Sequence, residues 1–396
     1  MKEKRILILG AANAQIPLIK KAREMGFYVI VCTYDPTEPG IEFANEYQNV
    51  STTDKEAVKN MAMERGVNAV TSWASDVAAP AAAYAAEVMG LPGNSFLTVK
   101  MLTRKDLFRE FLTQHRFSTP GYQILTEKEI HSGFNVSLTL PLIVKPVDSS
   151  GGRGVARVNK MSSLNAAVLD ALSYSGNKKV IIEEVIEKAG TQIHGDGFVL
   201  NGNLVFTHLG DHHFSHISDV IPVATSWPSR IPANLLQKLI SEIGKCVNRS
   251  GLQFGPINIE ARIDINHNIY IIELAPRAGV HSGSDLTKLG AGVDLPLETM
   301  KYLDGQKVNI EKLKTDCVAY YILHSKLTGY FSELTIDPAV EKYITNLTIK
   351  ANNGDKVRSY KNMKDAVGVI NLMFDNREEM SKCMDQIDKF VSVVVK

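Results

Sequence analysis

Two neighbouring stretches decide the fold of this sequence: Asn258-Ile259-Glu260-Ala261-Arg262-Ile263 and Ile269-Tyr270-Ile271-Ile272-Glu273-Leu274. Between them lie Asp264 to Asn268, where Asp, Asn and His are typical turn residues, so the two stretches predict a β-hairpin. If the turn is centred between Asn266 and His267, Glu260 lies directly opposite Glu273. Side chains paired in this way have Cβ atoms about 4.5–5.5 Å apart.

Two carboxylates this close repel each other, and a divalent cation between them removes the repulsion. Mg²⁺ takes one or two protein carboxylates together with phosphate oxygens of a substrate, so Glu260 and Glu273 are candidate metal ligands. The alternative is that both glutamates are exposed and form surface ion pairs. A register slip of one residue would place them on opposite faces.

Arg277 follows in Pro276-Arg277-Ala278-Gly279 and shares the parity of Glu273, so in an extended strand both side chains point to the same side. The planar fork of an arginine beside a metal-phosphate site can hold a carboxylate or a migrating phosphoryl group. The alternative is a solvated arginine at the end of a strand.

The composition excludes several classes of protein. An apolar content of 44% and a charged content of 22% are ordinary for a globular chain, and 396 residues allow two or three domains at roughly 150 residues each. The net charge of +1 predicts neither a nucleic-acid nor an anionic-membrane partner. No apolar run approaches the roughly 18 residues of a membrane helix. The widely spaced Cys32, Cys246, Cys317 and Cys383 favour packed thiols in a reducing cytoplasm over disulfides or a zinc site.

Strands and helices alternate at the start of the chain, which predicts a parallel sheet with crossover helices. The expected strands are 5–10, 28–32 and 67–71, and the helices between them are 16–25 and 55–65. A turn cluster at Gly90-Leu91-Pro92-Gly93 ends this α/β domain, which therefore covers residues 1–93.

From residue 140 onward, strands follow one another with few crossover helices, so a mixed or antiparallel sheet is expected. The predicted second domain, 94–310, consists of a helical connection, a small lobe and a large lobe, at 94–139, 140–190 and 191–310. Residues 311–396 are expected to form a small C-terminal α+β region that ends in a helix near 377–390.

A glycine-rich loop, Ser149-Ser150-Gly151-Gly152-Arg153-Gly154, follows a strand that carries Lys145 near its end. Backbone N–H groups approach phosphate closely only where side chains are absent, so the loop suits a nucleoside triphosphate. It is neither a P-loop nor a dinucleotide fingerprint, because both need glycines at other positions. The alternative is a plain linker.

Several histidines follow the strand 204–209, including His212 and His213. Three hypotheses are open for these histidines: they bind the substrate, they act as general base on an amine, or they lie in a solvated loop. Adjacent residues of a strand point apart, which argues against a shared metal. Further on, His281 to Asp285 opens a helix, where Ser282 is either an N-cap or part of a site for an anionic substrate group.

In this order along the chain, the motifs resemble the ATP-grasp superfamily over about residues 1–310, with an N-terminal parallel-sheet α/β domain, a two-lobed ATP-grasp domain and a small α+β region. The resemblance implies ATP and Mg²⁺ (or Mn²⁺) as cofactors, with Glu260 and Glu273 on the metal and Arg277 facing the phosphates. The nucleotide residues that it implies are Lys105, Lys145, Ser150, Gly151, Gly152, Gly154, and the backbone near Glu183, Glu184, Val185 and Ile186.

The sequence departs from the family pattern at two positions. Ala275 stands where a metal-contacting Asn is common, although carboxyaminoimidazole ribonucleotide synthetases look similar there; the hairpin pairs it with Asn258, which we expect to take over this contact. The glutamate that commonly binds the ribose is replaced by Gln192, with Glu187 as the alternative.

The resemblance implies a cytoplasmic carboxylate–amine ligase that forms an amide through an acyl phosphate, with small-molecule substrates; homodimers are common among such enzymes. Lys145 and Arg277 are the expected catalytic residues. The segment 349–355 loosely resembles the tail of L-amino acid ligases, which favours amino-acid substrates. The alternatives are a carboxylase or formyl-transfer ligase on a purine precursor, and an ATP-binding regulatory protein without ligase activity.

Overall fold

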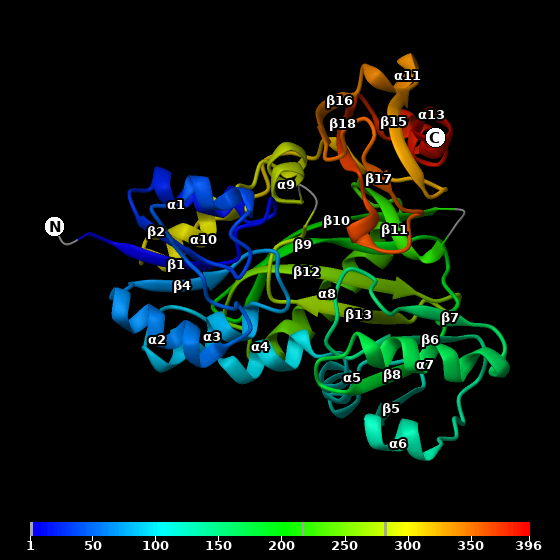
Figure 1. Cartoon of the computed structure of the whole chain (residues 1–396), viewed down its shortest axis with the longest axis horizontal. Coiled ribbons are helices and arrows are strands. Elements are labelled where there is room, and N and C mark those ends of the chain that lie inside the picture. Colours follow the sequence, from blue (N-terminus) through cyan, green and yellow to red (C-terminus); the bar gives the residue numbers. More distant parts are fainter. Residues whose placement is uncertain (1–2, 216–217, 281–282) are drawn as a thin grey trace.

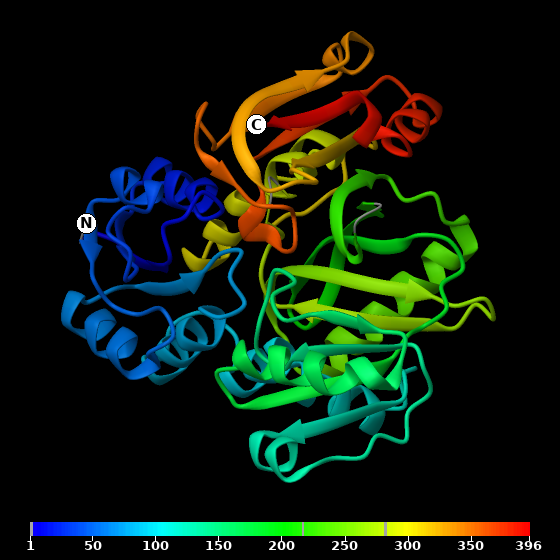
Figure 2. The same ribbon diagram turned by 45° about the vertical axis from the view of Figure 1, so that its right-hand side comes forward.

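The protein is described by a computed structural model, which covers residues 3–215, 218–280 and 283–396. Figures 1 and 2 show a central sheet with the small lobe beneath its β12–β13 edge and the C-terminal region above its other end. The N-terminal region lies to one side (Figure 1). No helix among the described residues is both long and apolar enough to cross a membrane.

The N-terminal sheet is parallel, as predicted, in the order β3-β2-β1-β4. Its strands are β1 (Arg5–Leu9), β2 (Tyr28–Cys32), β3 (Glu46–Gln48) and β4 (Ala69–Ser72). The layers around it contain α1 (Ile16–Glu24), η1 (Pro39–Phe43), α2 (Lys55–Arg65) and α3 (Ala79–Val88). Helix α2 has the predicted bounds because Asp54 caps its first turn and Gly66 ends it in a left-handed conformation.

Two helices, α4 (Phe96–Thr103) and α5 (Lys105–Gln114), lead into the small lobe. Its antiparallel sheet has the order β5-β8-β6-β7 and is covered by α6 (Glu127–Ser132), η2 (Met161–Ser163) and α7 (Leu164–Ser173). The strands are β5 (Tyr122–Thr126), β6 (Leu142–Pro146), β7 (Ala156–Val158) and β8 (Lys179–Glu184). The glycine-rich loop joins β6 to β7.

The central sheet is antiparallel throughout and has eight strands in the order β13-β12-β9-β10-β11-β14-β18-β16. The large lobe supplies β9 (Gln192–Leu200), β10 (Asn203–Ser215), β11 (Ser218–Trp227), β12 (Phe254–Ile263) and β13 (Ile269–Ala275). Its helices are α8 (Ala233–Ser250), α9 (Gly283–Ala291) and α10 (Leu295–Leu303), and α10 packs against α1 of the N-terminal region.

The C-terminal region extends the central sheet with β14 (Cys317–Leu323), β16 (Ile344–Ile349) and β18 (Gly368–Phe374). A second, three-stranded sheet contains β15 (Gly329–Ile336), β17 (Lys356–Val357) and β19 (Val391–Val395). Its helices are α11 (Pro338–Glu341), η3 (Met363–Asp365), α12 (Arg377–Met384) and α13 (Ile387–Phe390). The expected helical end is therefore wrong in one respect: β19 follows the helices and pairs with β15.

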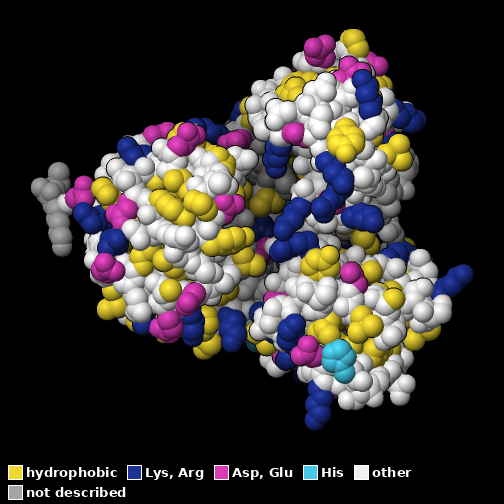
Figure 3. Space-filling model, in the orientation of Figure 1, with side chains coloured by type: hydrophobic (Ala, Val, Ile, Leu, Met, Phe, Trp, Pro, Cys, Tyr) yellow, Lys and Arg dark blue, Asp and Glu magenta, His cyan; other side chains and the backbone are white. Residues whose placement is uncertain are grey.

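The predicted fold class, an α/β domain followed by a two-lobed domain and an α+β region, agrees with this architecture. The surface in Figure 3 is hollowed where the N-terminal region, the small lobe and the C-terminal region meet, and Lys and Arg side chains gather beside the hollow.

Candidate functional site

The predicted pairing of Glu260 with Glu273 is confirmed. Near the turn, however, Ile263 pairs with Ile269 and Ala261 with Ile271, a register that would set Glu260 opposite Ile272. A bulge between Glu260 and Ala261 adds one residue to β13 and shifts the register, so that the two glutamates face each other. The same shift places Asn258 opposite Ala275, as expected.

Most of the predicted residues border one cavity of about 230 Å³ between the two lobes. They lie on both sides of the cavity: Lys105, Lys145, Ser150, Gly151, Gly152, Glu183, Glu184, Val185, Ile186, Gln192, His212, Asn258, Glu260, Glu273 and Arg277. One cavity therefore collects residues that the sequence spreads over α5, the small lobe and the large lobe.

Some predicted residues lie elsewhere. The side chain of Glu187 is exposed, and it does not border this cavity, whereas Gln192 is buried there. His213 points away from His212, as expected of neighbours in a strand, and its Nε2 lies 2.8 Å from Ser226 Oγ. Burial lowers the pKa of His213 to about 4. Ser282 lies outside the described residues.

Gly154 also lies outside the cavity lining, and it has a structural reason to be glycine. Its φ is +69°, and a Cβ there would lie 2.8 Å from the ring of Tyr174 and 3.0 Å from Pro146. Only glycine accepts both the left-handed backbone and this close approach.

On the small-lobe side, Arg109, Lys145 and Glu183 form a cluster that we call the cationic cluster. Glu183 accepts from Arg109 Nε at 2.7 Å and lies 2.6 Å from Lys145 Nζ. Burial by itself would raise the pKa of Glu183, but the two cations outweigh it and hold the pKa at about 2. Arg109 also donates to the backbone oxygens of Ile271 and Ile272, which ties this cluster to the hairpin.

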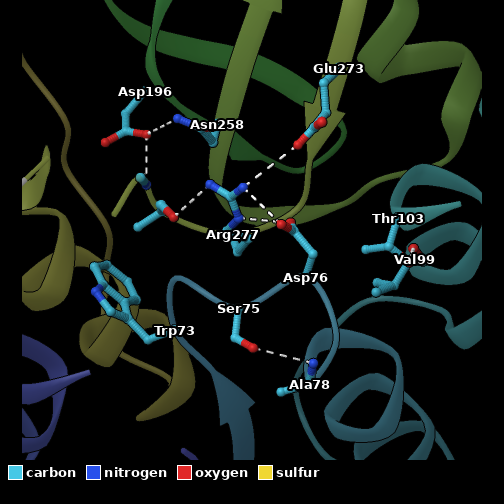
Figure 4. Close-up of polar contacts among 12 residues, drawn as sticks. Trp73, Ser75, Asp76, Ala78, Val99, Thr103, Asp196, Asn258, Glu273 and Arg277 are labelled. Carbon is cyan, nitrogen blue, oxygen red and sulfur yellow. Dashed lines mark hydrogen bonds and ion pairs between the residues drawn. The ribbon is translucent and has the colours of Figure 1, made fainter. Parts of the chain in front are cut away.

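On the opposite side, Asp76, Glu260, Glu273 and Arg277 form a cluster that we call the acidic cluster. Arg277 donates from Nε and Nη2 to both carboxylate oxygens of Asp76, at 2.7 and 3.0 Å, and Nη2 lies 3.6 Å from Glu273 (Figure 4). Burial, with the charges of Asp76 and Glu260, raises the pKa of Glu273 although Lys105 and Arg277 lower it. Asp76 and Glu273 thus share Arg277, whereas Glu260 lies 3.9 Å from His212 Nε2.

A polar wall continues from Glu260 along β9, β10 and β11. Thr225 Oγ1 donates to Tyr320 Oη at 3.0 Å and lies 2.8 Å from His212 Nδ1 and 3.3 Å from His194 Nδ1. Because a hydroxyl has one proton, Thr225 accepts from both imidazoles, which assigns their protons to Nδ1. His212 Nε2 is buried, has no hydrogen-bond partner among the described residues and lies 3.9 Å from Glu260 Oε1.

Two amides position groups of this wall. Asn258 Nδ2 lies 3.0 Å from His194 Nε2 and donates to Asp196 Oδ1 at 3.1 Å (Figure 4). Gln192 donates to Glu260 Oε2 at 3.0 Å and accepts from Arg262 Nε at 2.8 Å. Over the part of the chain that is described, no three His, Cys, Asp or Glu side chains are arranged as a metal site.

Sequence reasoning missed Arg109, Asp76, His194 and Tyr320. Arg109 carried a usable signal, because it lies four residues after Lys105 in a predicted helix and so shares its face. Asp76 follows β4, and the carboxyl ends of parallel strands commonly border ligand sites, which was a weaker signal. His194 and Tyr320 stand in strands that only the completed sheet brings to the cavity.

Comparisons with known proteins agree with this geometry. A family model for the ATP-grasp domain matches residues 138–285. Uncharacterized protein y4rH of Sinorhizobium fredii is 23% identical over 333 residues, which cover 79% of this chain and 66% of that protein. Phosphoribosylamine–glycine ligase of Caulobacter vibrioides is 27% identical over 154 residues, which cover 38% of this chain and 36% of the ligase.

Among solved structures, the L-amino acid ligase from Bacillus licheniformis has the same fold, with a TM-score of 0.83 at 19% identity over 100% of both chains. The two curated relatives are matched over less than two thirds of their own length. The domain match and the shared fold confirm the predicted ATP-grasp resemblance.

Proposed function

We propose that this chain, a member of the ATP-grasp superfamily, is an ATP- and Mg²⁺-dependent carboxylate–amine ligase that activates its acid as an acyl phosphate. One observation carries the proposal: a single cavity has the cationic cluster on one side and the acidic cluster, with its arginine, on the other. Such a cavity suits an anionic polyphosphate together with a divalent cation.

We assign the nucleotide to the space between the lobes. Lys145 provides positive charge for the phosphates, and Lys105 donates to the backbone oxygen of Ser149 at 2.8 Å, at the base of the glycine-rich loop. Gly151 and Gly152 have φ values of +68° and +75°, which give the loop the open backbone that phosphates require. The backbone at the end of β8 is assigned to adenine, and Gln192, which borders the cavity, is favoured over Glu187 for the ribose.

Glu260 and Glu273 are the residues assigned to Mg²⁺. The two carboxylates face each other across the hairpin and border the cavity, and burial with the charges of Asp76 and Glu260 raises the pKa of Glu273, so the residues present fit a cation. When bound, Mg²⁺ would supply positive charge beside the phosphates. Gln192 holds one oxygen of Glu260 and thereby fixes the plane of this carboxylate.

In the proposed reaction, an oxygen of the substrate carboxylate attacks the γ-phosphorus, and the bond from that phosphorus to ADP breaks. Arg277 holds the carboxylate and then the oxyanion that forms when the amine nitrogen attacks the acyl carbon. The acyl C–O bond breaks and releases phosphate, while the amine loses a proton. His212 Nε2, which is buried on this wall without a hydrogen-bond partner among the described residues, is assigned to receive this proton.

The acid is proposed to be an amino acid. The likeness to the L-amino acid ligase fold over both whole chains supports this choice, as does the joining of an amine to glycine that is named in the Caulobacter relative. We place the protein among small-molecule enzymes of the cytoplasm on the same basis.

Phosphate release from MgATP tests the proposal. The purified protein is supplied with each of the twenty L-amino acids, singly and in pairs, and with hydroxylamine as a general nucleophile that converts an acyl phosphate to a hydroxamate. We expect acid-dependent release of phosphate and formation of hydroxamate with a subset of the acids. Binding of MgATP without turnover of any acid would instead support a nucleotide-binding regulator.

A further inference from the structure

The strongest unassigned feature of the site is the ion pair of Arg277 with Asp76, two residues 201 positions apart in the sequence. Arg277 donates to Asp76 in the two-bond fork geometry that it would use for a substrate carboxylate. Its Nη1 donates to the backbone oxygen of Ala278 at 3.1 Å. The arginine assigned to the substrate acid is therefore already paired with a carboxylate of the protein.

Asp76 stands where two cavities meet. It borders the cavity between the lobes and also a second one of about 570 Å³, lined by the N-terminal region, α4, α5 and the base of the glycine-rich loop. Lys105, Ser149 and Glu273 border both. The side chain of Asp76 is 16% exposed, so a small molecule entering from either cavity reaches it.

The charge of Asp76 depends on its ion pair with Arg277. The nearby carboxylate of Glu260 repels the charge of Asp76 and raises the pKa of this side chain. Burial would raise the pKa of Asp76, and Arg277 is the group that outweighs burial and keeps it ionised. A purely structural role of the Asp76–Arg277 pair, in which it joins the N-terminal region to the large lobe, would not require an ionised side chain here.

We propose that Asp76 is a specificity-determining residue that binds the ammonium group of an α-amino acid whose carboxylate takes its place on Arg277. The inference rests on the proposed ligase function and names the substrate class of that site as zwitterionic. A zwitterion exchanges one protein–protein ion pair for two protein–ligand pairs. No buried charge is left without a partner, and both protein groups have already lost most of their water.

A simple carboxylic acid gives a different result. Its carboxylate can pair with Arg277, but it then leaves the ionised Asp76 without the cation that it is paired with in the free site. A site built to bind a polar group of its substrate strongly rejects an analogue that lacks this group. The pair should therefore distinguish an amino acid from the same acid without its amino group.

The proposed role of Asp76 is tested by comparing matched substrates in the wild type and in Asp76→Asn. Hydroxamate formation is measured with L-alanine against propionate, L-leucine against 4-methylpentanoate, and L-phenylalanine against 3-phenylpropionate. For the pair that reacts best, the wild type should prefer the amino acid by about 100-fold in kcat/KM. Asp76→Asn should reduce this ratio to below about fivefold while the KM for ATP stays within about twofold. Asp76→Glu, which keeps the charge, should keep the preference.

The matched control is Asp385→Asn. Asp385 also accepts two bonds from an arginine, Arg230, far away in the sequence, but it lies outside both cavities. It should leave the ratio unchanged. Equal loss of both substrates in Asp76→Asn, or a wild type without any preference, would overturn the assignment.

Equilibrium binding of the same six acids, with a non-hydrolysable ATP analogue and Mg²⁺ present, separates this inference from the ligase proposal. Amino-acid binding that Asp76→Asn abolishes, in a protein that forms no hydroxamate, supports the role of Asp76 and refutes ligation. Hydroxamate formation without a preference for the amino acid over the simple acid supports ligation and refutes the role of Asp76.

Discussion

The two charged clusters of the cavity differ in how complete they are. In the cationic cluster, Glu183 lies within 2.7 Å of both Arg109 and Lys145, so the carboxylate is fully neutralised. In the acidic cluster, Arg277 is the one cation paired with Asp76 and Glu273 among the described residues, and Glu260 lies 3.9 Å from His212 Nε2. The first cluster has one more positive charge than negative, whereas the second has two more negative charges than positive.

This difference separates stability from function. The cationic cluster lies at the junction of α5, β6 and β8 and also bonds the hairpin, so it is expected to hold the lobes together before any ligand binds. The acidic cluster is incomplete and is expected to gain its missing charges from ligands. Mutation of Glu183 in the first cluster should therefore change folding, whereas mutations in the second should change turnover and metal dependence.

The largest expected effect tests the acidic cluster. Arg277→Ala should lower turnover by about 10³-fold, since it removes the donors for the developing oxyanion, and change the affinity for ATP by less than about threefold. Arg277→Lys keeps the charge and loses the fork, so an intermediate loss is expected. Single-turnover rates and nucleotide titrations provide the measurement. Equal losses in turnover and ATP affinity would mean that Arg277 binds the ground state and the transition state alike.

A somewhat smaller effect tests the cationic cluster. Glu183→Gln leaves two buried cations undercompensated and should lower the free energy of unfolding by about 3 kcal/mol. Because the folded pKa of about 2 lies below the ordinary value of 4.5, the contribution of Glu183 is fully present above pH 4.5 and is lost as the pH falls towards 2. Denaturant unfolding at several pH values measures it. An unchanged stability at pH 7 would contradict the structural role of this cluster.

The smallest expected effect concerns the metal. Glu273→Gln should raise the Mg²⁺ concentration for half-maximal ATP turnover by about tenfold, equivalent to about 1.4 kcal/mol, because one charged ligand is lost. Glu242→Gln on α8, whose carboxylate pairs with Lys245 away from the cavity, is the control. If both variants have the wild-type Mg²⁺ dependence, the acidic cluster does not bind the cation.

Local chemistry allowed the hairpin to be predicted. Turn residues between two strands, together with the two-residue period of a β-strand, were enough to expect Glu260 opposite Glu273. The same reasoning did not reveal the bulge that produces this pairing, because one extra residue in a strand has no local signal here. The pairing was thus predicted correctly without the detail on which it depends.

Long-range contacts were beyond this reasoning. The strand that carries Glu183 was expected to approach adenine through its backbone; the ion pair of the Glu183 side chain with Lys145 was not foreseen, because it depends on β6 and β8 being neighbours in the small-lobe sheet. Among the described residues that the predictions named, Glu187, His213 and Gly154 do not border the cavity. Whether they border it depends on the path of a loop and on the face of the sheet to which a side chain points, and sequence spacing specifies neither.

The sequence by itself determined the alternation of strands and helices at the start of the chain, the glycine-rich loop and the pair of glutamates, because each depends on residues close together in the chain. Tertiary structure alone decided that Asp76 meets Arg277 and that β14 carries Tyr320 to the cavity. These contacts form when separately built sheets pack against each other, and the packing free energy is spread over many apolar residues, so no short motif encodes it.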